Sequence, residues 1–284
     1  MATTTTETPG YIPVSQWPNL DELAVGFREN MMTESTYLSR KRLDLAFSGT
    51  VSRTIRHHFV DQNVLKWEVL GSHECQIVQN GIAEYKAFEV RPPNIFFVDF
   101  FKPDYEEQVS LVLNISTGQA IACISGFHVK AGQKRTWTKF FDASIIESNS
   151  VIAASSPFQP TDDLIGKHVL YCYTSRDAYE HIYLNQGTFT WHCLSGTEKG
   201  LADTEPCKML KLADKLYLLF WSEKVMPVES VVVVDLDKMR STGRFFCWDP
   251  KPAKMVHMLF GSHATALANT NAAAVVSRQS NICL

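Results

Sequence analysis

The sequence predicts an all-β protein built from two antiparallel β-barrels in tandem. The first observation is an internal repeat, in which residues 164–248 match residues 38–128 with apolar position on apolar position. Trp67 falls on Trp191 in this alignment. A repeat of roughly 125 residues has the length of a small domain and is too long for a solenoid unit. The second observation is period-two alternation in short runs separated by Gly, Asn, Asp and Pro, which is typical of strands.

Composition indicates a globular protein with enough apolar residues for one large core or two ordinary ones. Of 284 residues, 45% are hydrophobic and 20% are charged, and the net charge is −3. Because basic residues are scattered among acids, nucleic acid is not expected as a partner. Apolar runs are too short for a bilayer and the start lacks a signal-peptide core, so we expect no membrane partner and a cytoplasmic location. Seven cysteines without a C-x-x-C spacing indicate reduced packing residues.

Residues 1–37 are expected to hold a disordered start and one short helix. Residues 1–10 are rich in threonine and offer nothing to bury. Asn19 is a good N-cap with Glu22 three positions on, which predicts a helix over residues 20–31. Its apolar residues recur at helical spacing: Leu20, Leu23 and Phe27. Such a helix could plug one end of a barrel.

Residues 38–129 and residues 164–263 each contain enough strand-like runs for one barrel. In the first copy the expected strands are 42–48, 53–60, 64–70, 74–79, 83–90, 95–101, 108–115 and 119–127. In the second copy they are 167–174, 179–184, 188–194, 208–212, 216–223, 230–236 and 244–249. About eight antiparallel strands joined by short turns suit an up-and-down barrel, which has no free edge. The predicted fold is therefore a tandem of calycin/lipocalin-like antiparallel barrels, with one larger fused sheet as the alternative.

Two segments lie outside the predicted barrels. Residues 130–163 end in a stretch rich in Ser and Pro and are expected to be a linker. Residues 264–284 are expected to be a tail, within which the Ala- and Asn-rich stretch 264–276 forms a weak helix.

The second copy concentrates ionisable and aromatic residues in one predicted strand. Tyr179, His181 and Tyr183 share one face of this strand, and Glu180 lies on the other. If that face lines a barrel, it places an imidazole with a pKa near the operating pH between two phenols, and these three residues are the candidate catalytic groups. The alternative is a core histidine, because His57 occupies the same place in the first copy.

Other residues are candidates for substrate binding around this strand. Three are candidate aromatic walls: Trp191, Tyr217 and Trp221. Three are candidate charges at the pocket mouth: Glu198, Asp203 and Arg240. Each has a structural alternative, since paired tryptophans suit a barrel core, and loop or rim charges are usually solvated. Glu223, at the end of a strand, is likewise interpreted as a rim charge.

The sequence shows no motif for a cofactor or a metal. It lacks a P-loop, a Gly-rich phosphate loop, and the G-x-S-x-G and H-E-x-x-H patterns. It also lacks His and Cys at metal-ligand spacing, so neither a cofactor nor a metal is expected. In the first copy, Arg53, Arg56 and His58 crowd one strand, which could bind an anion but is also typical of a solvent-facing strand.

Several stretches resemble one family. These are residues 11–17, 179–185, 190–194, 198–205 and 235–243. They look like the MoaF family, named for molybdenum-cofactor biosynthesis protein F, and the resemblance covers nearly the whole chain. It implies two lipocalin-like domains, in agreement with the repeat. A weaker resemblance, of character only, is to the calycin-like hetero-Diels–Alderases and cyclases of fungal natural-product pathways.

The preferred function is a cofactor-independent enzyme of small-molecule, natural-product metabolism. It would bind an apolar or phenolic substrate in a barrel pocket and promote dehydration or cyclisation, with an intermolecular hetero-Diels–Alder cycloaddition as one form. The alternatives are a non-catalytic small-molecule carrier and an accessory protein of molybdenum-cofactor biosynthesis, which would need a basic pocket for a phosphorylated pterin. A homodimer is left open.

Overall fold

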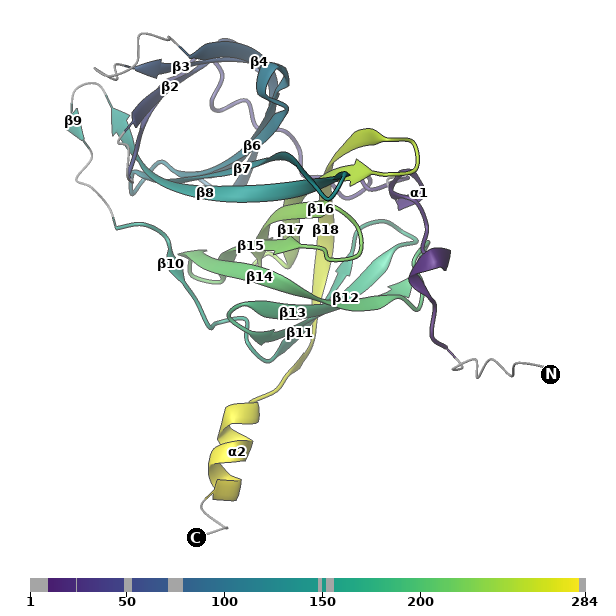
Figure 1. The fold of residues 1–284 in the computed structure, drawn as a ribbon. Helices are drawn as coiled ribbons and strands as arrows, with labels where there is room; N and C mark the ends of the chain where they lie inside the picture. The colour runs from purple at the N-terminus through teal and green to yellow at the C-terminus, as the bar shows by residue number, and fades with distance from the viewer. Residues whose placement is uncertain are drawn as a thin grey trace, which may run out of the picture.

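The computed structural model is an all-β protein with two closed antiparallel barrels in tandem, as the repeat predicts (Figure 1). It describes residues 10–23, 25–48, 53–70, 79–147, 150–151 and 156–280. In Figure 1 the first barrel lies above the second. The N-terminal segment packs against the second barrel before the chain enters the first, and the chain returns to the second barrel after β9 (Ser150–Val151). Within the described ranges, no helix is long and apolar enough to cross a bilayer.

Eight strands form the wall of the first barrel in chain order. They are β1 (Arg42–Phe47), β2 (Arg53–Phe59), β3 (Val64–Leu70), β4 (Asn80–Arg91), β5 (Ile95–Lys102), β6 (Glu107–Asn114), β7 (Gln119–Lys130) and β8 (Gln133–Glu147). Each pairs with the next, and β1 also pairs with β8, which closes the barrel. A 3-10 turn, η2 (Pro103–Tyr105), joins β5 to β6, and the short β9 (Ser150–Val151) pairs with β8.

The second barrel repeats this order with eight strands of its own. They are β11 (Lys167–Cys172), β12 (Ala178–Asn185), β13 (Thr188–Ser195), β14 (Ala202–Ala213), β15 (Leu216–Ser222), β16 (Val228–Asp235), β17 (Arg240–Asp249) and β18 (Lys254–Asn269). Here β11 pairs with β18 to close the barrel. The short β10 (Gln159–Pro160) precedes β11 in the chain and pairs with β14.

The strand registers confirm the repeat residue by residue. In the first barrel, His57 on β2 lies opposite Trp67 on β3. In the second barrel, His181 on β12 lies opposite Trp191 on β13. The same histidine–tryptophan pair therefore occupies the same place in both barrels.

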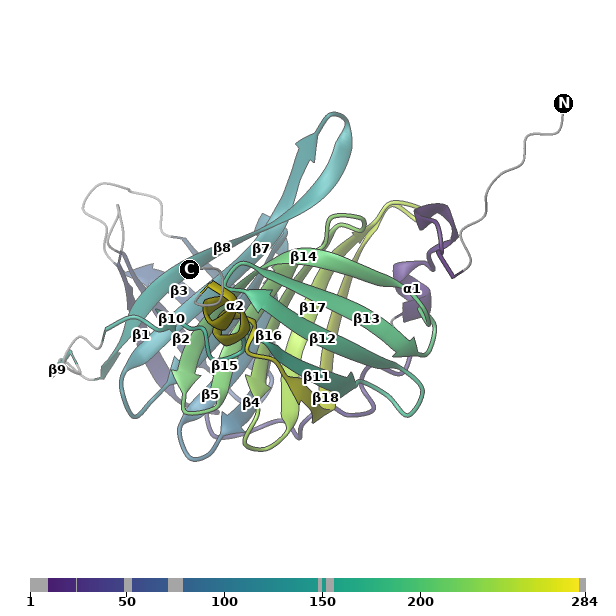
Figure 2. The same cartoon turned by 90° about the horizontal axis from the view of Figure 1, so that it is seen from below.

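The predicted strands include neither β8 nor β18, so both predicted barrels end too early in the chain. Strand β8 occupies much of the expected linker 130–163, and β18 runs into the expected tail 264–284. The first half of β8 lies in a β7–β8 hairpin that extends beyond the barrel wall (Figure 2). Most residues of that half are only partly buried, so neither face shows a clean apolar alternation.

The N-terminal helix is shorter than predicted but covers the barrel end as expected. After the 3-10 turn η1 (Val14–Gln16), helix α1 spans only Leu20–Leu23, and the chain then turns through Gly26, whose φ is +87°. The Asn19 backbone N–H donates to Glu22 Oε2 at 2.9 Å, which is one half of the predicted capping box. The three apolar residues of the predicted face are all buried: Leu20, Leu23 and Phe27.

Some predictions fall outside the described residues. These are the disorder of residues 1–9, nearly all of the strand 74–79, and the state of Cys75 and Cys283. The other five cysteines are free, as expected of packing residues. A C-terminal helix, α2 (Ala272–Ser280), begins later than the weak helix predicted over 264–276.

Four apolar clusters lie in the described part of the chain, and the smallest packs Leu20 and Leu23 of α1 against β16–β18. Of the others, one fills each barrel, and one lies between the outer faces of β4–β7 and of β14–β18. Strand β5 serves two clusters, since Phe96 and Val98 point into the first barrel and Phe97 points toward the second. Because both faces of such a strand are buried, its sequence is an unbroken apolar run and does not alternate between apolar and polar residues.

The contact between the barrels also contains buried charge. Arg244 on β17 is fully buried, and its guanidinium donates to Ser110 Oγ at 3.0 Å and to Ser125 Oγ at 2.7 Å in the first barrel. Arg244 Nε lies 3.9 Å from Asp99 Oδ1 on β5. At the other end of this contact, Arg91 binds Asp235 with two hydrogen bonds of 2.9 and 2.7 Å.

Candidate functional site

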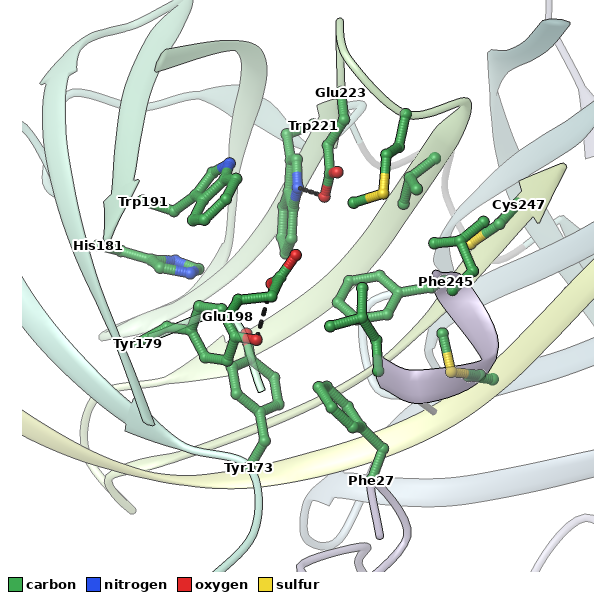
Figure 3. A pocket seen from close by; sticks show the side chains of 15 residues that line it. Phe27, Tyr173, Tyr179, His181, Trp191, Glu198, Trp221, Glu223, Phe245 and Cys247 are labelled. Atoms are coloured by element: carbon green, nitrogen blue, oxygen red, sulfur yellow. Dashed lines mark hydrogen bonds between the residues drawn. The ribbon is translucent and has the colours of Figure 1, made fainter. Parts of the chain in front are cut away.

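A small cavity lies inside the second barrel beneath the N-terminal segment (Figure 3). Its volume is about 50 Å³, below the range typical of ligand pockets. Its polar side is formed by Tyr179, His181, Trp191, Glu198 and Glu223. Its remaining wall is apolar or aromatic, and Leu20, Leu23 and Phe27 close one side of it. The N-terminal segment is thus part of the cavity wall.

Strand alternation places the polar residues of β12 and β13 inside the barrel. Along β12, Tyr179, His181 and Tyr183 are buried, while the residues between them are only partly buried. Along β13, Trp191 is buried in the same way, opposite His181. The shared face predicted from the sequence is therefore the inner face of the barrel.

Glu198 enters the cavity from the loop between β13 and β14. The residue is 6% exposed, and the Tyr179 hydroxyl donates to Glu198 Oε2 at 2.8 Å. Burial raises the pKa of Glu198 to about 7, because this one hydrogen bond offsets only part of the lost hydration and Asp177 adds repulsion. Glu198 is therefore a carboxyl group that can gain or lose a proton near neutral pH.

His181 does not have the pKa near operating pH that its sequence position suggested. The ring is enclosed by aromatic side chains, with Tyr171 at 4.7 Å and Trp221 at 5.6 Å between ring centroids. Burial lowers the pKa of His181 to about 3, so the imidazole is neutral at physiological pH. It can donate or accept a hydrogen bond, but the group that titrates near neutrality is Glu198.

Glu223 is a second carboxyl in the cavity and was interpreted from the sequence as a solvated rim charge. That interpretation is wrong, because the strand end carrying Glu223 turns its side chain inward beside Trp221, whose Nε1 donates to Glu223 Oε1 at 3.3 Å (Figure 3). Burial, and then repulsion from Glu198 and Glu205, raises the pKa of Glu223 well above its ordinary value. Strand alternation could have predicted this inward direction, since residues 221 and 223 lie on the same face of an extended chain.

Three polar atoms of the cavity residues have no hydrogen-bond partner in the described part of the chain. They are His181 Nδ1, Trp191 Nε1 and Glu198 Oε1. A buried polar atom left without a partner costs on the order of 1–3 kcal/mol, so native proteins rarely leave one unpaired. Three in the lining of one cavity indicate a place where another molecule supplies the missing partners.

The structure brings five of the nine predicted site residues together at this cavity. They are Tyr179, His181, Trp191, Glu198 and Trp221. Tyr183 faces the same interior but lies deeper, where its hydroxyl is 2.9 Å from the Tyr171 hydroxyl.

The other three predicted residues lie elsewhere. Tyr217 donates to Asp163 at 3.2 Å and lines a different hollow. Asp203 lies on the rim, 3.4 Å from Lys224 Nζ. Arg240 donates to the backbone oxygen of Asn30 at 3.1 Å. Sequence spacing does not say which end of a barrel a residue occupies. It therefore could not separate the predicted wall residue Tyr217, or the predicted mouth residues Asp203 and Arg240, from the residues that line this cavity.

The described residues contain no cluster of three or more His, Cys, Asp or Glu that could hold a metal ion. Glu198 and Glu223 are instead available as proton-exchanging or hydrogen-bonding groups. The described lining of this cavity includes no lysine or arginine.

Comparisons with known proteins agree with the sequence resemblance. Family models match at residues 15–129, as the MoaF N-terminal domain, and at residues 158–270, as the MoaF C-terminal domain. The Protein MoaF of Klebsiella aerogenes is 34% identical over 172 residues, which is 57% of this chain and 65% of that protein. The match thus spans less than two thirds of the relative.

Among solved structures, a crystal structure from Burkholderia vietnamiensis described as a candidate beta-lactamase is similar to part of the chain. It is 14% identical, and the match covers 38% of this chain and 99% of that one, with a TM-score of 0.32. A likeness at this level supports no inference about function.

Proposed function

Since the chain belongs to the MoaF family, we propose that it is a small-molecule-binding protein with a role linked to molybdenum-cofactor biosynthesis, and that its second barrel holds the ligand. The family name supports the metabolic setting. The cavity supports the ligand class, a small neutral molecule with an aromatic or apolar body and a hydroxyl or carbonyl group.

The observation that carries this proposal is the set of unpartnered atoms on His181, Trp191 and Glu198. An indole N–H can only donate, a glutamate oxygen in its charged form can only accept, and a neutral imidazole does one or the other at each nitrogen. A phenolic hydroxyl both donates and accepts, so it satisfies two of these atoms at once. The surrounding aromatic rings suit the ring of such a ligand.

Glu198 gives the site a chemical capacity beyond binding. With a pKa of about 7, it is present in both protonation states at neutral pH and can take a proton from a ligand or return one. Proton transfer of this kind serves dehydration and cyclisation. We propose Glu198 as the acid–base group, with His181 and Tyr179 orienting the ligand. A carrier would use the same pocket without proton transfer.

The size and charge of the cavity separate the proposed ligands. A volume of about 50 Å³ is too small for the two joined reactants of a cycloaddition, and even a phenol requires the lining to open. A phosphorylated pterin would meet Glu198 and Glu223 without a cationic partner in the described lining, which disfavours it here.

Phenol binding tests this proposal. We expect phenol to bind the wild-type protein and Glu198→Gln to weaken binding about tenfold, because the variant places an amide where a carboxylate oxygen accepts the phenol proton. The measurement is isothermal titration calorimetry at pH 8, where Glu198 is mostly ionised.

A matched control is Glu205→Gln. Glu205 is 1% exposed and burial raises its pKa to about 7 as well, but it does not line the cavity, so its variant should bind phenol within about threefold of wild type. Equal phenol affinity in wild type and Glu198→Gln would show that the ligand does not contact Glu198.

A further inference from the structure

We propose that the first barrel is a second, independent binding site, which takes a molecule with an apolar or aromatic body and one anionic group. Its interior contains a cavity of about 420 Å³, within the range typical of small-molecule sites. The wall is mostly apolar and includes Val109, Leu111, Ala122 and Ile124. This site does not depend on the function proposed for the second barrel.

The repeat explains why the two cavities differ in volume. The strand registers place smaller side chains of the first barrel where the second barrel has larger ones: Ile55 corresponds to Tyr179, Phe100 to Trp221, and Ile124 to Phe245. The N-terminal segment adds Leu20, Leu23 and Phe27 to the second cavity only. The interior of the second barrel is thus nearly filled by side chains, whereas the first barrel keeps a large cavity.

The two cavities also differ in charge at one equivalent position. Lys102 follows the inward-facing Phe100 on β5, just as Glu223 follows Trp221 at the end of β15. Both residues line their cavities. The repeat therefore has a cation in the first barrel where it has a carboxyl in the second, and this exchange reverses the charge that each cavity favours in a ligand.

The contacts of Lys102 hold its ammonium group at the cavity wall. Nζ lies 2.6 Å from Glu107 Oε2, 4.9 Å from the ring centroid of Trp67 and 4.7 Å from that of Tyr105. An ammonium group has three N–H donors, so the ion pair leaves donors for a ligand anion. The side chain is only 15% exposed, which strengthens its attraction for an anion relative to a lysine in open water.

His57 adds no charge to this site at physiological pH. Burial, and secondarily Lys102, lowers the pKa of His57 to about 4, so its imidazole is neutral at physiological pH. His57 Nδ1 lies 3.2 Å from the backbone oxygen of Ile55, which leaves Nε2 as an acceptor. The described lining therefore carries two cations, Arg53 and Lys102, against one carboxylate, Glu107.

Two fluorescent probes test the site on the full chain. The anionic probe is 8-anilinonaphthalene-1-sulfonate, and N-phenyl-1-naphthylamine is its neutral counterpart without the sulfonate. We expect both to bind the wild-type protein. Lys102→Met should weaken the sulfonate probe about tenfold and change the neutral probe less than threefold, whereas Glu107→Gln should tighten the sulfonate probe. Lys86→Met removes an exposed lysine from the same barrel and should change neither.

A second variant fixes the location of the site. Ile124→Phe installs the residue that the second barrel has at the equivalent place, so the fold should tolerate it, while the filled cavity should lose both probes. Circular dichroism checks that each variant is folded. The proposal is overturned if the wild type binds neither probe, if Lys102→Met affects both probes equally or neither, or if folded Ile124→Phe binds both as before.

Discussion

Arg244→Ala is expected to lower the free energy of unfolding by about 3–5 kcal/mol, the range measured when one partner of a buried ion pair is removed. Arg244 is fully buried between the barrels and donates to Ser110, Ser125 and the backbone oxygen of Glu229. Its removal leaves Asp99 with less compensating charge in a site that water does not reach. Urea unfolding followed by tryptophan fluorescence measures the loss.

Two comparisons make the Arg244 prediction specific. Arg56→Ala removes a partly exposed arginine that pairs with Asp44 and Glu68, and it should cost less than about 1 kcal/mol. The double variant Arg244→Met with Asp99→Asn removes both charges and should recover much of the loss. If Arg244→Ala is no more destabilising than Arg56→Ala, the buried contact does not hold the barrels together.

Glu198→Gln is expected to remove one of several similar contributions to the pH dependence of stability between pH 4.5 and 8, since burial also raises the pKa values of Glu205 and Glu223. The folded protein holds the pKa of Glu198 at about 7, against an ordinary value of 4.5 in the unfolded chain. Stability is therefore full below pH 4.5 and is lost as the pH rises through 7, because only the unfolded state ionises readily in that window. At about 1.4 kcal/mol for each pKa unit, the contribution is about 3 kcal/mol.

The measurement is the free energy of unfolding by urea at pH 5 and at pH 8. The loss of stability between these two values should be smaller in Glu198→Gln than in the wild type by about 2–3 kcal/mol. Glu68→Gln is the control, because Glu68 is an exposed carboxyl paired with Arg56 and should leave the loss unchanged. The same loss in wild type and Glu198→Gln would mean that Glu198 is ionised in the folded protein at pH 5.

Part of the candidate site could be predicted from the sequence, because strand alternation fixes the face on which a residue lies. This rule predicted that Tyr179 and His181 share one face of a strand, and that face is the inner one. The repeat aligned Trp191 with Trp67, while only the strand register shows that Trp191 lies opposite His181. The same rule could have found Glu223, two residues beyond Trp221. It could not exclude Tyr217 or Arg240, because alternation assigns a face and says nothing about which end of the barrel a residue lines.

Fold class and the two-barrel repeat were predictable before any coordinates, because period-two patterning and a domain-length repeat can be recognised without tertiary contacts. The family followed from the resemblance of particular stretches such as residues 179–185 and 198–205. The chemistry of the barrel interior, by contrast, depends on tertiary contacts. The pKa values of Glu198 and His181 move in the directions they do because burial removes water from groups whose sequence context looks ordinary. The eighth strands, β8 and β18, were likewise decided by closure, since their partners lie at the far end of each repeat.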